Sequence, residues 1–141
     1  MSDVIDIDPR MSHVTDLANA LGFQRIVRFE EGVGRVAIEY RVGPHMCHTN
    51  GTIAQGGFVT GWIDQAMGFC VIAATGRTMS PLSLEIKVSF LKSVPPGLVI
   101  AEGWVEMLGR KTGFLEGRLL DSSGAVLAKG TSTVKLVKLG A

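Results

Sequence analysis

The longest apolar stretch of the chain runs from Phe58 to Ala74 and contains one charged residue, Asp64, near its middle. Apolar side chains would occur almost all round a helix formed by this stretch, so that helix must be covered on most of its sides. The stretch is marginally short for crossing a bilayer. We therefore expect a buried central helix in a soluble protein, beginning around Gly56 and ending around Gly76.

The rest of the chain shows the short, β-branched patterns that are typical of strands. Before the central helix we expect a helix at about 13–21, strands at 23–30 and 34–42, and a loop at 43–55. After it we expect strands at 83–90, 98–107, 112–120 and 126–137. Four consecutive strands joined by short turns favour an antiparallel sheet. A curved sheet wrapped around the one long helix buries both, which predicts an α+β domain.

The segment from Ser83 to Phe90 alternates strictly between polar and apolar residues. Alternate side chains of a strand point to opposite faces, so one face should carry the apolar residues and the other face the polar ones. The residues expected on the apolar face are Leu84, Ile86, Val88 and Phe90.

The composition suits a small domain that associates with copies of itself. With 141 residues, we expect one domain over residues 1–141, with an N-terminal helical segment at 1–22. Fourteen basic and 13 acidic residues leave a net charge of +1, which gives no support for a nucleic-acid or acidic-surface partner. Hydrophobic residues make up 46% and charged residues 19%, so we expect part of the surface to be covered by subunit contacts.

The cysteines and histidines show no disulfide or metal-ligand spacing. Cys47 and Cys70 are too few for a disulfide scaffold and form no CxxC pair, which predicts reduced thiols in a cytoplasmic protein. The acidic N-terminus does not resemble a signal peptide. We interpret the three histidines as exposed residues and expect no bound metal. They are His13, His45 and His48.

Asp64 is the residue that points to chemistry. A carboxylate in an apolar helix loses hydration, so it must be paired, have a shifted pKa or serve a function. The helix alone does not separate a structural carboxylate from a catalytic one. The start of the helix favours catalysis, because Gly56 and Gly57 after Gln55 leave backbone N–H groups uncovered at the positive end of the helix dipole. Such N–H groups stabilise the oxyanion that forms when a carbonyl is attacked.

The spacing of these two groups predicts a dimer. Gly56 and Asp64 are eight residues apart, which is roughly 12 Å along a helix axis. A base and an oxyanion donor must each lie about 3 Å from their reacting atoms, so one chain can hardly place both on one carbonyl. Two antiparallel helices side by side can do so. The catalytic hypothesis therefore predicts a homodimer with two equivalent sites, in which Gly56 of one subunit faces Asp64 of the other.

The residues from His48 to Phe58 read His-Thr-Asn-Gly-Thr-Ile-Ala-Gln-Gly-Gly-Phe and are followed by Asp64. This pattern resembles the signature of the PaaI-like (phenylacetyl-CoA thioesterase) branch of the hotdog thioesterases. Later parts of the chain resemble the strands and turns of the same family, at 83–91, 97–102, 109–112 and 121–131. The resemblance covers about residues 34–138. It implies a hotdog fold and hydrolysis of an acyl-CoA without a metal or redox cofactor, and we expect a homotetramer built from two dimers.

The resemblance also implies roles for individual residues. Asp64 matches the nucleophile or general base of the family, and Gly56 matches the glycine whose N–H polarises the thioester carbonyl. Asn50 matches a loop asparagine near the thioester, and Ser83 matches a strand hydroxyl that positions water or the carboxylate. Gln55 stands where many members carry histidine. Its side chain can donate a hydrogen bond to a carbonyl but cannot titrate.

Two segments match the parts of the family that contact CoA. The first comprises Phe90, Leu91, Lys92, Ser93, Val94 and Pro95, and the second comprises Gly109, Arg110, Lys111 and Thr112. Three basic side chains within them can meet phosphates, namely Lys92, Arg110 and Lys111.

The preferred hypothesis is therefore an acyl-CoA thioesterase for small or medium acyl or aryl groups, in which Asp64 activates water or attacks directly. An alternative is a non-catalytic protein that binds acyl-CoA or an acyl carrier, which would share the pocket without needing Asp64. A hotdog dehydratase ranks last, because it would need an Asp/His pair. No histidine occurs in the expected central helix or in the strand that follows it.

Overall fold

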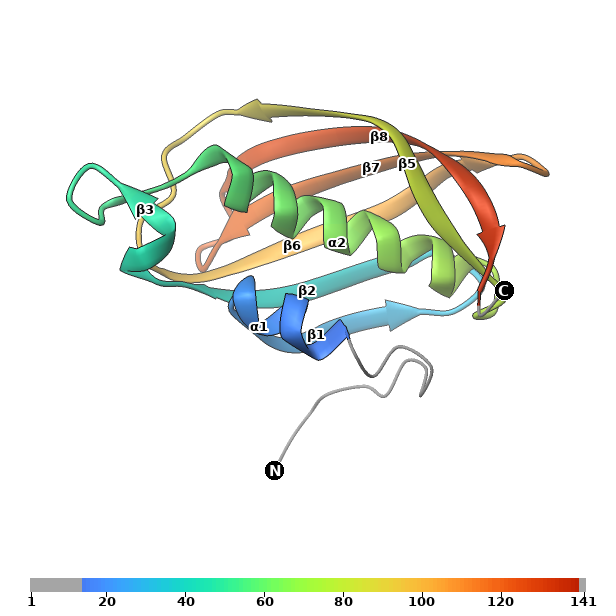
Figure 1. Ribbon diagram of the computed structural model, residues 1–141, viewed down its shortest axis with the longest axis horizontal. Coiled ribbons are helices and arrows are strands. Elements are labelled where there is room, and N and C mark those ends of the chain that lie inside the picture. The colour runs from blue at the N-terminus through green and yellow to red at the C-terminus, as the bar shows by residue number, and fades with distance from the viewer. Residues whose placement is uncertain (1–13, 140–141) are drawn as a thin grey trace.

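The computed structural model describes residues 14–139 (Figure 1). His13 and the rest of the expected segment before it lie outside the described residues. The first helix, α1, spans Val14–Ala20. The chain turns at Gly22, whose φ is +78°, and a Cβ there would lie 2.3 Å from the backbone oxygen of Arg41. Glycine is therefore required at the turn into the first strand.

Most of the expected elements are present with nearly the expected bounds. The strands of the main sheet are β1 (Phe23–Glu30), β2 (Arg35–Val42), β5 (Met79–Phe90), β6 (Gly97–Leu108), β7 (Thr112–Asp121) and β8 (Val126–Lys138). The central helix α2 spans Gly56–Ala74. The region 43–55 was expected to be a loop and differs: it contains the short 3-10 helix η2 (Pro44–Met46) and a hairpin of β3 (Cys47–His48) and β4 (Ile53–Ala54).

The six long strands form one antiparallel sheet in the order β1-β2-β6-β7-β8-β5. The sheet curves around α2, which runs across its concave side (Figure 1). The expected α+β architecture, with a curved antiparallel sheet around one long helix, is confirmed. Because the strand that follows α2 joins the far end of the sheet, β1 and β5 are its two edge strands.

The core lies between α2 and the sheet. Trp62, Ile63 and Met67 are buried on the side of the helix that faces the strands. Two glycines let the helix come close: a Cβ on Gly103 would lie 2.5 Å from the Ala66 backbone, and one on Gly117 would lie 2.9 Å from the Ile63 side chain. Substituting either glycine would push the helix away from the sheet.

Within residues 14–139, part of the opposite side of α2 is left uncovered. Residues of this open face are small or polar: Gly57 and Asp64 are exposed, and Thr60 and Gly68 are half-buried. Ten of the 19 residues of α2 are buried and only Gly57 and Asp64 are exposed, so the expectation that the helix is covered on most sides is confirmed apart from this face. By length and composition α2 is apolar enough to cross a membrane, and half of its most apolar window is buried among the described residues.

Strand β5 does not keep the strict alternation that its sequence suggests. Ser83 pairs with Val134 and Glu85 pairs with Thr133, so Leu84 has no partner and forms a β-bulge. Because the bulge inserts one extra residue into β5, the side chains before the bulge point to the opposite face from the one that regular alternation would give them. The expected apolar face of four residues is therefore wrong at Leu84, whose side chain is 63% exposed.

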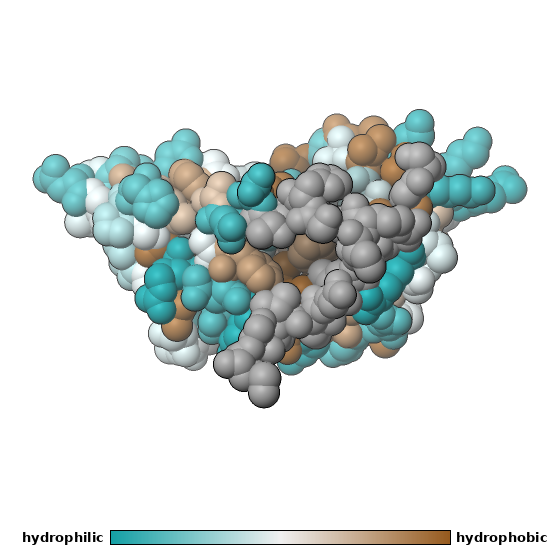
Figure 2. Space-filling view, turned by 60° about the horizontal axis from the view of Figure 1, so that its bottom comes forward, coloured by the Kyte–Doolittle hydropathy of each residue, from teal (hydrophilic) through white to brown (hydrophobic). Residues whose placement is uncertain are grey.

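Several other large apolar side chains also remain at the surface of the single chain. Those on or next to β5 are Leu82, Leu84, Phe90 and Leu91. In the space-filling view, the visible face is hydrophilic at its two ends and carries hydrophobic patches between them (Figure 2). This distribution is consistent with the low charge content of the sequence.

Candidate active site

Helix α2 begins at Gly56, and Gln55 is its N-cap. The Gln55 side chain folds back so that its Oε1 accepts a hydrogen bond of 2.8 Å from the Gly57 N–H. A Cβ at position 57 would lie 2.6 Å from that oxygen, so the cap requires glycine there. The cap occupies the acceptor end of the Gln55 amide and leaves its NH2 group for other partners.

The N–H of Gly56 is not used by the cap. Among residues 14–139 no oxygen accepts a hydrogen bond from it, whereas the next three N–H groups of the chain all donate to Gln55. It lies at the positive end of a 19-residue helix, where N–H groups favour negative charge. Phe90 covers one side of this glycine, since a Cβ at position 56 would lie 3.2 Å from the Phe90 Cζ atom.

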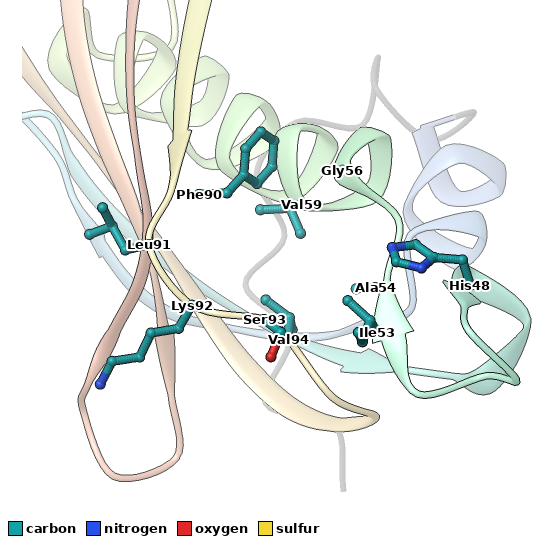
Figure 3. Close-up of a pocket in the computed structure, with 10 residues that line it drawn as sticks. All are labelled: His48, Ile53, Ala54, Gly56, Val59, Phe90, Leu91, Lys92, Ser93 and Val94. Atoms are coloured by element: carbon teal, nitrogen blue, oxygen red, sulfur yellow. The ribbon is translucent and has the colours of Figure 1, made fainter.

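A cavity of about 310 Å³ opens beside the start of α2 (Figure 3). Its two walls are the hairpin of β3 and β4 and the segment that leaves β5. The lining is mostly apolar and consists of His48, Ile53, Ala54, Gly56, Val59, Phe90, Leu91, Lys92, Ser93 and Val94. The chain therefore presents a helix N-terminus to a largely apolar cavity, which is an arrangement that suits a neutral carbonyl group on an apolar arm.

Asp64 lies two turns further along α2, on the open face. Its side chain is exposed in the single chain. Neighbouring protein atoms still remove part of its hydration and raise the pKa of Asp64, while a hydrogen bond with the Ser83 side chain acts in the opposite direction. The net pKa is raised. Asp64 is therefore a carboxylate that faces outward and is held by one neighbouring hydroxyl.

The bulge at Leu84 brings Ser83 to Asp64. Val134, the partner of Ser83 in β8, is buried against the core, so Ser83 shares the side of the sheet that faces α2. With the regular alternation expected from the sequence, Ser83 would share a face with the polar residues and point the other way. Asp64 and Ser83 thus come together because of the bulge, which the alternating sequence pattern did not predict.

Asn50 lies at the exposed tip of the β3–β4 hairpin. The tip has left-handed backbone at three successive residues, with φ of 54° at Thr49, 57° at Asn50 and 76° at Gly51. Asn and Gly adopt this conformation readily, so the turn itself explains the asparagine. Asn50 does not line the cavity beside Gly56.

The two segments expected to contact CoA lie at opposite ends of the sheet. Residues 90–94 line the cavity next to Gly56, whereas Pro95 does not. Residues 109–112 form the turn from β6 to β7, at the other end of the molecule (Figure 1). Within the first segment, the Lys92 side chain points away from the cavity (Figure 3). One chain therefore brings the first segment, and not the second, to the start of α2.

A buried polar pair lies behind Asp64 and was not predicted. The hydroxyl of Tyr40 on β2 donates a hydrogen bond to Oε1 of Gln65, the residue next to Asp64. Burial raises the pKa of Tyr40, and the charge of Asp64 raises it further. Tyr40 also packs against Trp62, with ring centroids 6.1 Å apart. The pairing joins residues 25 positions apart, so no local pattern signals it.

His48 was interpreted as an exposed histidine and is exposed, but it also lines the cavity that contains Gly56. It reaches this place because His48 pairs with Ile53 across the tight hairpin turn. The Asn50-Gly51 turn signal was visible in the sequence, and treating it as a hairpin would have placed His48 beside the strand that leads into α2.

Asp64 and Gly56 do not meet within one chain. Helix α2 runs from Gly56 to Ala74, so the two residues lie roughly 12 Å apart along its axis. Asp64 is not among the residues that line the cavity. Over residues 14–139, no three His, Cys, Asp or Glu side chains are grouped so that they could hold a metal ion.

Comparison with known proteins identifies the family. The family model described as the thioesterase superfamily matches residues 51–128, which include β4, α2 and the strands β5, β6 and β7. The chain belongs to the thioesterase superfamily. The match contains Gly56, Asp64 and Ser83. No curated protein sequence matches the chain.

Several solved structures share the fold of this chain at low sequence identity. The PaaI protein from the phenylacetic acid degradation operon of E. coli has a TM-score of 0.80 and 18% identity, covering 91% of this chain and 88% of that one. A hypothetical thioesterase of Streptococcus pneumoniae with coenzyme A has a TM-score of 0.79 and 20% identity, covering 91% and 97%. The smu.793 protein of Streptococcus mutans bound to acetyl CoA has a TM-score of 0.72 and 23% identity, covering 80% and 87%. The hotdog fold implied by the sequence resemblance is confirmed.

Proposed function

We propose that this protein is an acyl-CoA thioesterase that hydrolyses small or medium acyl or aryl thioesters to the free acid and CoA. The observation that carries the proposal is the unused Gly56 N–H at the positive end of α2, which opens onto a largely apolar cavity in a member of the thioesterase superfamily. A thioester carbonyl oxygen seated on this N–H becomes more negative during attack, so the N–H binds the transition state better than the substrate.

Asp64 supplies the second half of the chemistry. In one route its carboxylate accepts a proton from water, whose oxygen attacks the carbonyl carbon; the C–S bond then breaks and the CoA thiolate leaves and is protonated. In the other route the Asp64 carboxylate attacks the carbonyl carbon, the C–S bond breaks, and the CoA thiolate leaves and is protonated. Water then hydrolyses the resulting mixed anhydride, which releases the acid and restores the Asp64 carboxylate. Ser83 supports both routes, because its hydrogen bond orients the Asp64 carboxylate. The Asn50 side chain and the free NH2 group of Gln55 would orient the attacking water.

The complete site forms between two copies of the chain. Asp64 and the N–H of Gly56 are too far apart on one helix, and the open face of α2 is lined by small residues that allow a second helix to approach. The neighbouring edge strand β5 carries Leu82 and Leu84, which are 54% and 63% exposed. An unpaired edge with exposed apolar side chains favours pairing with another chain. Antiparallel packing of two α2 helices would set Gly56 of one protomer against Asp64 of its partner.

The same dimer would explain how residues 90–95 and 109–112, which lie at opposite ends of one chain, could contact the same CoA. Antiparallel packing brings one end of a protomer toward the other end of its partner, so residues 90–95 of one chain and 109–112 of the next can contact one CoA. Lys92, Arg110 and Lys111 are exposed and can meet its phosphates. Structural neighbours with coenzyme A and acetyl CoA bound support CoA as the carrier. The proposal includes a cytoplasmic homotetramer of two dimers and requires no metal or redox cofactor.

The first experiment measures release of free CoA from a panel of acyl-CoA and aryl-CoA thioesters by the wild type and by Asp64→Asn. We expect the variant to lose at least about 10³-fold in kcat while it still binds a non-hydrolysable thioether analogue. If no thioester is hydrolysed above background by the wild type at micromolar concentration, the alternative of a non-catalytic acyl-CoA or acyl-carrier binding protein replaces this proposal.

A second experiment tests whether the site is shared. Asp64→Asn and Gly56→Pro, each inactive alone, are co-expressed so that mixed dimers form. One of the two sites in a mixed dimer then has both Gly56 and Asp64, so random pairing should restore about a quarter of wild-type activity. Absence of any recovery in purified mixed dimers would show that both groups act within one chain.

A further inference from the structure

The β3–β4 hairpin places a second possible hydrogen-bond donor on the cavity that Gly56 lines. His48 is the last residue of β3, pairs with Ile53, and lines the same cavity as Gly56. Its imidazole points toward the segment that leads through Ala54 into α2 (Figure 3). The ring therefore lies on the side of the cavity where the thioester carbonyl is placed in the proposed function.

The ring is held in this orientation by its neighbour. His48 Nδ1 lies 2.8 Å from the Thr49 Oγ1 atom. Thr49 has left-handed backbone, with a φ of +54°. Left-handed backbone is unfavourable for a β-branched residue. Thr52 stabilises this turn, since its hydroxyl donates a hydrogen bond of 2.6 Å to the Thr49 carbonyl.

We propose that His48 is a catalytic residue whose Nε2–H donates a hydrogen bond to the thioester carbonyl oxygen, alongside the N–H of Gly56, and that Thr49 is the positioning residue that fixes its ring. When the Thr49 hydroxyl donates to Nδ1, the ring hydrogen resides on Nε2, the nitrogen on the far side of the ring from this contact. Two donors then share the negative charge that develops as water attacks. No proton leaves His48 in this step.

The other polar groups near Gly56 are less suited to this role. Gln55 uses its Oε1 atom to cap the helix, so its amide cannot rotate freely. Lys92 and Ser93 line the cavity, but the Lys92 ammonium and the Ser93 hydroxyl point away from it (Figure 3). His48 is the lining residue whose polar atoms face the start of α2.

The inference rests on the proposed function and is tested first by steady-state kinetics. His48→Ala should lower kcat by about 10- to 100-fold with little change in KM, because a donor that acts on the developing oxyanion stabilises the transition state. His48→Gln keeps an N–H donor and should recover part of the loss. Equal loss in both variants, or a change confined to KM, would overturn the proposal. His48 is exposed, so both variants should keep the wild-type melting temperature.

The role of Thr49 is tested with a matched pair. Thr49→Val keeps the β-branched shape and the backbone strain but lacks the hydroxyl, whereas Thr49→Ser keeps the hydroxyl. We expect the valine variant to lose about tenfold in kcat and the serine variant to retain activity. In the His48→Ala background the Thr49→Val substitution should cause no further loss, since Thr49 acts through His48. An additional full loss in that background would contradict the proposed coupling.

A spectroscopic readout separates failure of this inference from failure of the proposed function. The C=O stretching frequency of an acyl-CoA bound to Asp64→Asn is measured by infrared difference spectroscopy, which requires binding but no turnover. Two donors should shift the band to lower frequency than in free acyl-CoA, and adding His48→Ala should reverse part of that shift. An unchanged frequency would overturn the role of His48 even if the wild type is an active thioesterase. A wild type without activity whose band still responds to His48→Ala would instead overturn only the proposed function.

Discussion

The Ser83 hydroxyl forms a hydrogen bond with the Asp64 carboxylate because a bulge at Leu84 turns Ser83 toward α2. The pair joins the edge strand of the sheet to the open face of the central helix. It gives the carboxylate a fixed neighbour on the side where a second protomer is expected to pack.

Removing this hydrogen bond should change the pH dependence of hydrolysis. Partial burial raises the pKa of Asp64 and the Ser83 hydrogen bond lowers it. If the ionised carboxylate is the active form, kcat/KM falls as the pH drops through this pKa. Ser83→Ala removes the lowering effect, so the acidic limb of the pH–rate profile should move to higher pH. Ser83→Thr keeps the hydroxyl and serves as the control; a shift to lower pH in Ser83→Ala would refute the assignment.

The N–H of Gly56 can be removed with little change to the helix. Gly56 is the first residue of α2, where proline is tolerated, and Gln55 before it has the extended backbone that proline prefers. Gly56→Pro should lower kcat by about 10²- to 10³-fold, as expected for loss of an oxyanion donor.

Gly56→Ala is the matched control for that variant. Both substitutions add a Cβ that would lie 3.2 Å from Phe90 Cζ, but alanine keeps the N–H. We expect Gly56→Ala to retain most of the activity. Similar loss in both variants would show that contact with Phe90, rather than the missing donor, is responsible. Circular dichroism melting curves would verify that both variants fold.

The pair of Tyr40 and Gln65 should contribute to stability rather than to chemistry. Tyr40 is fully buried, and its hydroxyl donates to Gln65 Oε1. Tyr40→Phe leaves that amide oxygen without its partner and should lower the free energy of unfolding by about 1–2 kcal/mol. The double variant Tyr40→Phe with Gln65→Leu should recover part of the loss, because no polar group is then left unpaired. Urea titration of the four proteins measures the coupling, and additive losses would argue against a direct interaction.

The apolar edge of β5 should be needed for association. Leu84 is 63% exposed in the single chain, and a lysine there would place a charge in the proposed dimer contact. Leu84→Lys should shift the protein toward monomer in size-exclusion chromatography with light scattering and reduce kcat together with the dimer fraction. Val33 is 66% exposed in the turn between β1 and β2, at the other edge of the sheet, and Val33→Lys is the control. A fully active, monomeric Leu84→Lys variant would refute the shared site.

Local patterns determined the element order. The helix from Gly56, the two strands before it and the four strands after it follow from hydrophobic periodicity and turn residues, which act over a few neighbouring positions. The same local reading singled out Gly56 and Asp64, because a carboxylate and a Gly-Gly helix start stand out in an apolar stretch. The structure leaves these residues where the sequence placed them along α2.

Contacts between distant parts of the chain decided the rest. Whether Leu84 pairs or forms a bulge depends on the register between β5 and β8. The face to which the Ser83 side chain points could therefore not be predicted from the alternation of β5 alone. The hairpin that brings His48 to the cavity lined by Gly56 depends on pairing across residues 49–52. The open face of α2 exists because the sheet packs against only one side of the helix. An amino-acid pattern records which residues are apolar, but only the packed chain determines which of them are covered.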